Sequence, residues 1–219
     1  MTLKILGKKQ VFEGKFMKVW ETTFLDKEGN EQGWKWVEKK DTVMIFAITR
    51  DSKVVLIKNF RVPLEKYVIE LPAGLLDKKG ENTENAIKRE LVEETGYAIE
   101  TLYALPPDPF SASISNNMRR CYIATGATKV SDAKGDATED ISVIEVPAQE
   151  LVNYCLNNKE FFNMHILALY QIALSKGFSN LNYLFYSGFI ISSLCMFYKK
   201  QLRSKLENKH PHLYSTILT

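Results

Sequence analysis

Three glutamates close together in this 219-residue chain have the residue type and spacing that suit chemistry best. Glu90, Glu93 and Glu94 are related by spacings of three and four, so an α-helix would place them on one face. Repulsion between like charges at this spacing costs about 0.2–0.5 kcal/mol per pair, and carboxylates in a last helical turn also oppose the helix dipole. A positive group is therefore expected beside them.

Two positive groups can offset these crowded carboxylates. Arg89 stands four residues before Glu93, and a divalent cation offsets more negative charge than one guanidinium does. Carboxylate oxygens on a rigid helix suit Mg²⁺ or Mn²⁺, which take their other ligands from water and substrate phosphates. The pattern indicates metal-assisted phosphate chemistry, and a solvated acidic helix face is the alternative.

The helix that carries the glutamates is predicted from Thr83 to Glu94, with Gly96 ending it and with Ile87 and Leu91 on the buried face. Most predicted strands precede this helix, which favours an α+β or α/β sandwich around a mixed sheet. The predicted strands cover 11–24, 33–39, 43–49, 53–58, 67–71, 120–125 and 141–146, and further helices are predicted from about 147 and over 162–175.

The segment around this helix resembles the Nudix box. Glu81, seven residues, and Arg89-Glu-Leu-x-Glu-Glu-x-Gly-Tyr97 match the box, whereas six residues instead of five separate Gly74 from Glu81. The extra residue falls in the 77–80 turn and leaves the helix pattern intact. The resemblance implies a Nudix-type α/β/α sandwich and hydrolysis of a nucleoside diphosphate linked to another group.

The Nudix resemblance also implies roles for individual residues. Arg89 would orient the glutamates, and Glu81 would brace the loop against the helix. Bound Mg²⁺ or Mn²⁺ would neutralise the diphosphate and help to generate hydroxide from water. The implied metal ligands are Glu90, Glu93, Glu94 and the backbone carbonyl of Ala73.

Over about residues 14–151 the chain resembles the ADP-ribose and ADP-sugar pyrophosphatase branch of the family. The segments that carry this resemblance are Trp20-Glu-Thr-Thr-Phe24, Trp34-Lys-Trp-Val37, Lys58-Asn-Phe-Arg-Val-Pro63 and Tyr67-Val-Ile-Glu-Leu-Pro-Ala-Gly74. The branch implies cleavage of ADP-ribose or a related ADP-sugar into AMP and a sugar phosphate. It also implies a homodimer whose subunits share the site.

Alignment with this branch assigns substrate contacts. Phe16 and Trp34 would flank the adenine, because aromatic faces stack on bases, although strand aromatics also serve as core or dimer interface. Arg61 would pair with the diphosphate, with a surface ion pair to Glu65 as the alternative. Glu70 would contact the terminal ribose or a water on the metal.

The general base is expected in the polar loop 134–140. Glu139 matches the base of the branch best, Asp136 and Asp140 are rivals, and a solvated loop carboxylate is the alternative. The segment 106–115 departs from the branch, with Phe110 at a position that usually holds glycine. This segment shapes the sugar end of the pocket in the branch, so the preferred sugar stays open.

Two other functions are weighed against hydrolysis of an ADP-sugar. One is hydrolysis of another nucleotide sugar, such as GDP-mannose, or of a dinucleoside polyphosphate. The other is a non-catalytic Nudix module that binds a nucleotide sugar. The intact set Glu90, Glu93 and Glu94 argues against the module, because binding alone needs no set of metal ligands.

The chain is expected to have three regions. Residues 1–42 would form an antiparallel β extension for dimerisation and base binding, and residues 43–177 the hydrolase domain. Residues 178–219 would form a C-terminal helical tail. Its apolar part belongs to 22 residues without charge, 177–198, which precede a basic stretch. Packing on the domain or on a second subunit is the main interpretation, and membrane contact through 181–205 is the alternative.

Composition limits the partners and the compartment. The 29 Lys and Arg against 26 Asp and Glu give a net charge of +3, too small and scattered to indicate nucleic-acid binding. Three well-separated cysteines favour a reducing compartment over a disulfide scaffold. With no secretory signal expected at the N-terminus, the predicted location is cytoplasmic.

Overall fold

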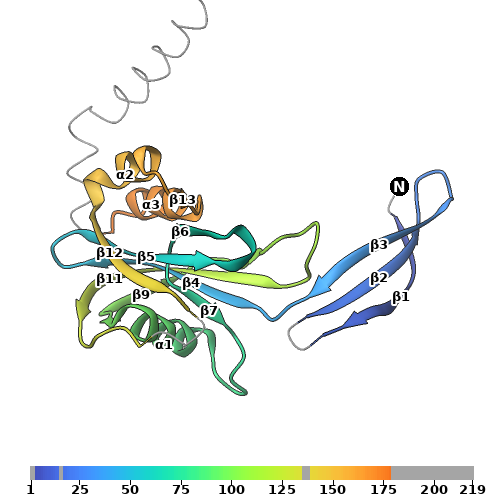
Figure 1. The fold of residues 1–219 in the computed structure, drawn as a ribbon, viewed down its shortest axis with the longest axis horizontal. Helices are drawn as coiled ribbons and strands as arrows, with labels where there is room; N and C mark the ends of the chain where they lie inside the picture. The colour runs from blue at the N-terminus through green and yellow to red at the C-terminus, as the bar shows by residue number, and fades with distance from the viewer. Residues whose placement is uncertain (1–2, 15–16, 135–138, 179–219) are drawn as a thin grey trace, which may run out of the picture. The chain divides into compact units, whose positions relative to one another are not determined.

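The chain contains an α/β/α sandwich and a small N-terminal antiparallel sheet (Figure 1). The computed structural model describes residues 3–14, 17–134 and 139–178. The sandwich around a mixed sheet and the N-terminal antiparallel β extension predicted from the sequence are confirmed.

The N-terminal sheet has the strand order β1-β2-β3, with both pairs antiparallel. Its strands are β1 (Lys4–Glu13), β2 (Lys18–Leu25) and β3 (Glu31–Glu38). The single strand predicted over 11–24 is wrong, because a turn in which the Gly14 N–H donates to Met17 O at 2.8 Å divides it. Residues 4–10 of β1 are not predicted as strand, because all ten residues of β1 are exposed and show no buried face.

The central sheet mixes parallel and antiparallel pairs in the order β10-β11-β4-β5-β6-β13. Four further strands extend it: β7 pairs with β4, β8 and β9 pair with β11, and β12 pairs with β5. The strands are β4 (Thr42–Thr49), β5 (Lys53–Arg61), β6 (Lys66–Glu70), β7 (Ala73–Leu75), β8 (Tyr97–Ala98), β9 (Thr101–Ala104), β10 (Asp108–Pro109), β11 (Met118–Lys129), β12 (Ile141–Pro147) and β13 (Phe161–Phe162).

Alternating side chains of β4 serve the two faces of the sheet. Ile45 belongs to the buried cluster that includes Ile87 and Leu91 of α1 (Thr83–Thr95), as predicted for these helix residues. The next residue, Phe46, instead meets Tyr170 of α3 (His165–Ser175), with ring centroids 6.2 Å apart. Figure 1 shows α1 on one side of the sheet and α2 (Leu151–Asn157) and α3 on the other.

Strands β4 and β5 separate, and this separation positions the site. They pair at Ala47–Val55 and Ile48–Val54, after which β5 continues along β6 while the beginning of β4 pairs with β7. Pro72 links β6 to β7, and its carbonyl accepts a hydrogen bond from Ile45 N at 3.0 Å. The chain therefore passes from β6 through β7 toward the start of α1, and all three carry candidate site residues.

Of the predicted tail 178–219, residues 179–219 lie outside the described residues, and so does the alternative membrane contact over 181–205. Within the described part of the chain, no helix is both long and apolar enough to cross a membrane. Two single-turn 3₁₀ helices, Val62–Leu64 and Ala148–Glu150, complete the described elements.

Candidate active site

The two ends of α1 are defined by local contacts. Asn82 caps the first turn, where its side chain accepts a hydrogen bond from Asn85 N at 2.8 Å. Gly96 ends the helix in the left-handed conformation with φ 76°, and a Cβ there would lie 2.0 Å from Ser131 O. The glutamates consequently occupy the last turns of a helix whose end is fixed.

The three glutamates lie in different environments. Glu94 is 6% exposed, whereas the side chain of Glu93 is 46% exposed and that of Glu90 is 15% exposed. Glu94 Oε2 accepts a hydrogen bond from Ala73 N at 2.9 Å. Because β7 pairs with β4 at Ala73 and Met44, this carboxylate is anchored between helix and sheet.

Glu94 has a strongly perturbed carboxyl group. Burial raises its pKa to about 8, against the lowering effect of the hydrogen bond from Ala73. The negative charges of Glu139 and Glu90 raise the pKa further, and the positive charge of Arg61 lowers it. The charged form of Glu94 is thus disfavoured, and a cation bound beside it would reverse that balance.

Arg89 joins the acidic residues into one network. Its Nε and Nη2 donate to the two oxygens of Glu81, each at 3.0 Å, and its Nη1 lies 2.7 Å from both Glu90 Oε1 and Glu93 Oε2. These bonds raise the pKa of Arg89 and lower that of Glu81. The pKa of Glu90 is still raised, because its burial outweighs the contact with Arg89. Arg89 therefore contacts Glu81, Glu90 and Glu93 at once, while its orienting role and the bracing role of Glu81 stay predictions.

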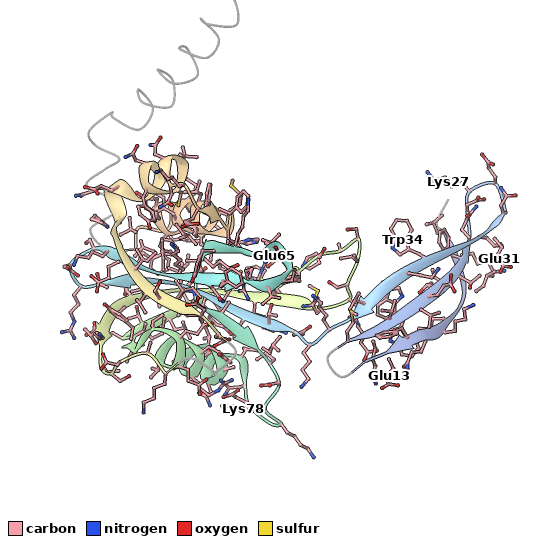
Figure 2. The ribbon with its side chains drawn as sticks, in the orientation of Figure 1. Glu13, Lys27, Glu31, Trp34, Glu65 and Lys78 are labelled. Atoms are coloured by element: carbon pink, nitrogen blue, oxygen red, sulfur yellow. The ribbon has the colours of Figure 1, made fainter. Side chains whose placement is uncertain are left out.

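Gly74 lets the loop before α1 approach the helix closely. A Cβ at this position would lie 2.1 Å from Glu90 Cδ, so no larger residue fits without moving that glutamate. The 77–80 turn, which contains the additional residue, is closed by a hydrogen bond that Glu81 N donates to Lys78 O at 3.2 Å (Lys78 is labelled in Figure 2). The insertion therefore leaves the pair of Glu81 with Arg89 intact.

Arg61 and Glu70 lie together at the ends of β5 and β6. Arg61 Nε donates to Glu70 Oε2 at 2.9 Å, and Nη2 lies 2.5 Å from the same oxygen. The alternative partner expected for Arg61, Glu65, is therefore wrong. Glu65 instead ends the 3₁₀ turn in a left-handed conformation with φ 53° (Figure 2).

The three candidates for the general base, Glu139, Asp140 and Asp136, differ in their surroundings. Glu139 is exposed, and its negative charge contributes to the raised pKa of Glu94. The side chain of Asp140 accepts a hydrogen bond from the Tyr67 hydroxyl. Asp136 lies outside the described residues.

Of the two aromatic residues predicted to stack on adenine, the structure describes one. Phe16 lies outside the described residues, whereas Trp34 stands on β3 with 54% of its surface exposed (Figure 2). Trp34 Nε1 donates to Ser113 O at 3.0 Å, and Val37 N donates to Ile114 O at 2.7 Å. The 106–115 segment thus contacts β3. The sequence gives no local signal for this contact, because the partners are 79 residues apart.

The donor set fits a hard divalent cation. Among the residues that the structure describes, no three carboxylate, imidazole or thiol groups converge as a ready-made ion site. Glu90 and Glu93 are each paired with Arg89 Nη1, at 2.7 Å. Glu94 supplies a buried anion in need of positive charge, and cations such as Mg²⁺ complete their coordination with water and phosphate oxygens.

The mixed sheet, its two helical layers and the acidic end of α1 define a Nudix-type α/β/α sandwich. Residues 38–165, more than half of the chain, match the NUDIX domain family. The chain therefore belongs to the Nudix family and is a Nudix hydrolase.

Comparison with individual proteins agrees with this assignment. The chain is 29% identical over 174 residues to the methanol dehydrogenase activator of Bacillus methanolicus, covering 79% of this chain and 94% of that protein. It is 29% identical over 148 residues to the ADP-ribose pyrophosphatase of Bacillus subtilis strain 168, covering 67% and 80%. The crystal structure of an ADP compounds hydrolase has the same fold, with a TM-score of 0.69, 21% identity and coverage of 81% and 95%.

Proposed function

We propose that this chain hydrolyses the diphosphate bond of ADP-ribose or a related ADP-sugar, giving AMP and a sugar phosphate, with Mg²⁺ or Mn²⁺ as cofactor. The observation that carries the proposal is Glu94, a buried carboxylate whose pKa is raised to about 8 beside Ala73 and Glu90. The similarity to the Bacillus subtilis ADP-ribose pyrophosphatase supports the choice of substrate.

The metal would be held by the carboxylates of α1 and the backbone of β7. When bound, it neutralises the diphosphate and lowers the pKa of water. Arg89 holds two of the carboxylates against their mutual repulsion. The proposed ligands are Glu90, Glu93, Glu94 and the carbonyl of Ala73.

The substrate would lie between the ends of β5 and β6 and the indole of β3. Arg61, held by Glu70 through its Nε and Nη2, would bind a diphosphate oxygen. Trp34, whose Nε1 is fixed on Ser113, would stack on adenine, an interaction worth about 1–3 kcal/mol. Phe16 is the proposed second aromatic, and Glu70 would also contact the terminal ribose or a water on the metal.

Glu139 is the proposed general base. It would accept a proton from the attacking water while the water oxygen forms a bond to one phosphorus. The bond from that phosphorus to the bridging oxygen breaks, and the departing phosphate keeps the electron pair. The proposal is supported by the effect of Glu139 on the proposed metal ligand Glu94, because the negative charge of Glu139 raises the pKa of Glu94.

The direct experiment is a panel of ADP-ribose, ADP-glucose, GDP-mannose and diadenosine polyphosphates with Mg²⁺. A phosphatase added to the reaction releases phosphate from the products but not from the intact diphosphates. We expect AMP and ribose 5-phosphate from ADP-ribose, with a kcat/KM about tenfold or more above that for GDP-mannose. Preferred cleavage of GDP-mannose or a dinucleoside polyphosphate would contradict an ADP-sugar as the substrate. Measurable binding without any cleavage would favour the non-catalytic module.

A further inference from the structure

Tyr67 and Asp140 meet directly beside the proposed general base. The Tyr67 hydroxyl donates to Asp140 Oδ2, and the Asp140 carbonyl accepts a hydrogen bond from Phe60 N at 3.1 Å. Phe60 and Tyr67 are opposite each other in the pairing of β5 with β6. Both hydrogen bonds to Asp140 thus come from a single cross-strand pair.

Tyr67 is itself held by its neighbours. Its ring meets that of Phe60 edge to face, with centroids 5.3 Å apart, and Lys58 Nζ lies 4.6 Å from the Tyr67 centroid. Lys58 is fixed in turn by Glu160, whose Oε1 is 2.7 Å from Nζ. A ring constrained in this way loses little further freedom when its hydroxyl donates a hydrogen bond. The bond to Asp140 raises the pKa of Tyr67, so the hydroxyl keeps the proton that it donates.

Glu139 precedes this anchored residue by one position. Strand β12 begins just after Asp140, where Ile141 pairs with Asn59 of β5. Glu139 therefore stands immediately outside the sheet, at an exposed position, while its charge acts on Glu94. A catalytic group displaced by 1 Å can lose about a hundredfold in rate, so an exposed base needs a fixed backbone.

We propose that Tyr67 is a positioning residue that acts through Asp140 to hold Glu139 toward Glu94 and the attacking water. The inference rests on the proposed function, because it takes Glu139 as the general base. Tyr67 makes no contact with the reacting atoms in this account. Its hydroxyl ties the residue next to the base to the rigid pair of β5 and β6.

The kinetic test compares Tyr67→Phe with the wild-type chain, using ADP-ribose and saturating Mg²⁺. This change removes the hydroxyl and keeps the ring that packs on Phe60 and Lys58. We expect kcat to fall about tenfold while KM changes less than twofold. Tyr103→Phe is the matched control, since β9 pairs with β11 on the other side of β4, and it should leave both constants unchanged. Asp140→Asn keeps an acceptor for the hydroxyl and should retain most of the activity, whereas Asp140→Ala should match Tyr67→Phe.

The Glu139→Gln variant distinguishes a positioning role of Tyr67 from a general loss of structure. If Tyr67 acts through Glu139, adding Tyr67→Phe to Glu139→Gln should change kcat less than twofold. A further tenfold loss in that background would overturn the inference. So would an unchanged kcat for Tyr67→Phe in the otherwise wild-type chain.

Hydrogen exchange gives a readout that needs no turnover. The amides of Phe60 and residues 139–141 should exchange faster in Tyr67→Phe than in the wild-type chain or Tyr103→Phe. Unchanged exchange would overturn this inference alone. Failure of the wild-type chain to cleave any nucleotide diphosphate would refute the proposed function, and exchange would still decide whether Tyr67 anchors this segment.

Discussion

Glu94 differs from its two neighbours in a way that their spacing does not show. Glu90, Glu93 and Glu94 all belong to one acidic pattern, yet only Glu94 among these three falls in the buried class. Its anchor, Ala73 N, comes from a strand 21 residues earlier. The resulting burial makes the charged form of Glu94 costly unless a cation is bound.

The pKa of Glu94 predicts how stability depends on pH without divalent metal. The folded-state pKa of about 8 lies above the ordinary 4.5, so the folded chain holds this proton more tightly than the unfolded chain does. The resulting stabilisation is complete below pH 4.5 and is lost as the pH rises through 8. Glu94→Gln cannot ionise. In chelator at pH 9 its Tm should exceed that of the wild type by about 4–8 °C, since a penalty of about 2 kcal/mol for the buried charge corresponds to about 2–4 °C per kcal/mol at this size.

Glu84→Gln, an exposed change in the first turn of the same helix, serves as the control and should leave the Tm nearly unchanged. Differential scanning calorimetry between pH 5 and pH 9 makes the comparison. Equal pH dependence in Glu94→Gln and the wild type would show that Glu94 carries no uncompensated charge.

At the scale of elements, the contact of β7 with α1 depends on Gly74. In Gly74→Ala the new Cβ would lie 2.1 Å from Glu90 Cδ, so Glu90 must leave its position or the loop must move. We expect kcat for ADP-ribose to fall about tenfold or more, with a stability loss of about 1–3 kcal/mol from overpacking. Gly7→Ala is the control, because nothing lies within 4 Å of a Cβ there. Normal turnover in Gly74→Ala would show that catalysis does not depend on the position of Glu90.

Element boundaries could be predicted where the signals are local. The helix expected over 83–94 is found at Thr83–Thr95, because its apolar spacing and its glycine stop lie within the segment itself. The short strands β7, β8, β9 and β10 were not predicted, since they are defined by pairing with distant strands. The predicted helix over 162–175 begins later, at His165, because Phe161–Phe162 pairs with β6.

The same distinction applies to the site. The ion pair of Arg89 with Glu93 lies within one turn of α1, so the spacing of four residues was sufficient to expect it. The contacts of Trp34 with Ser113 and of Tyr67 with Asp140 join residues 79 and 73 positions apart. Nothing in the local sequence specifies such pairs, and only the folded chain brings them together.

At the scale of the whole molecule, the N-terminal sheet is the proposed dimer surface. Strand β1 is exposed along its length and presents apolar side chains such as Ile5, Val11 and Phe12. We expect sedimentation to give twice the chain mass of 25.1 kDa. Phe12→Glu should shift the mass toward one chain, whereas Leu156→Glu, an exposed change on α2, should not. A wild-type chain that sediments as a monomer would contradict the dimer.

The central claim is that Glu94 binds the metal that permits cleavage of the diphosphate. Its most direct test is the Mg²⁺ dependence of kcat for ADP-ribose in the wild-type chain, Glu94→Gln and the control Glu84→Gln. We predict that wild type and control turn over only with the metal and that Glu94→Gln loses at least about a hundredfold in kcat while staying folded. Near-normal Mg²⁺-dependent turnover in folded Glu94→Gln would contradict the claim.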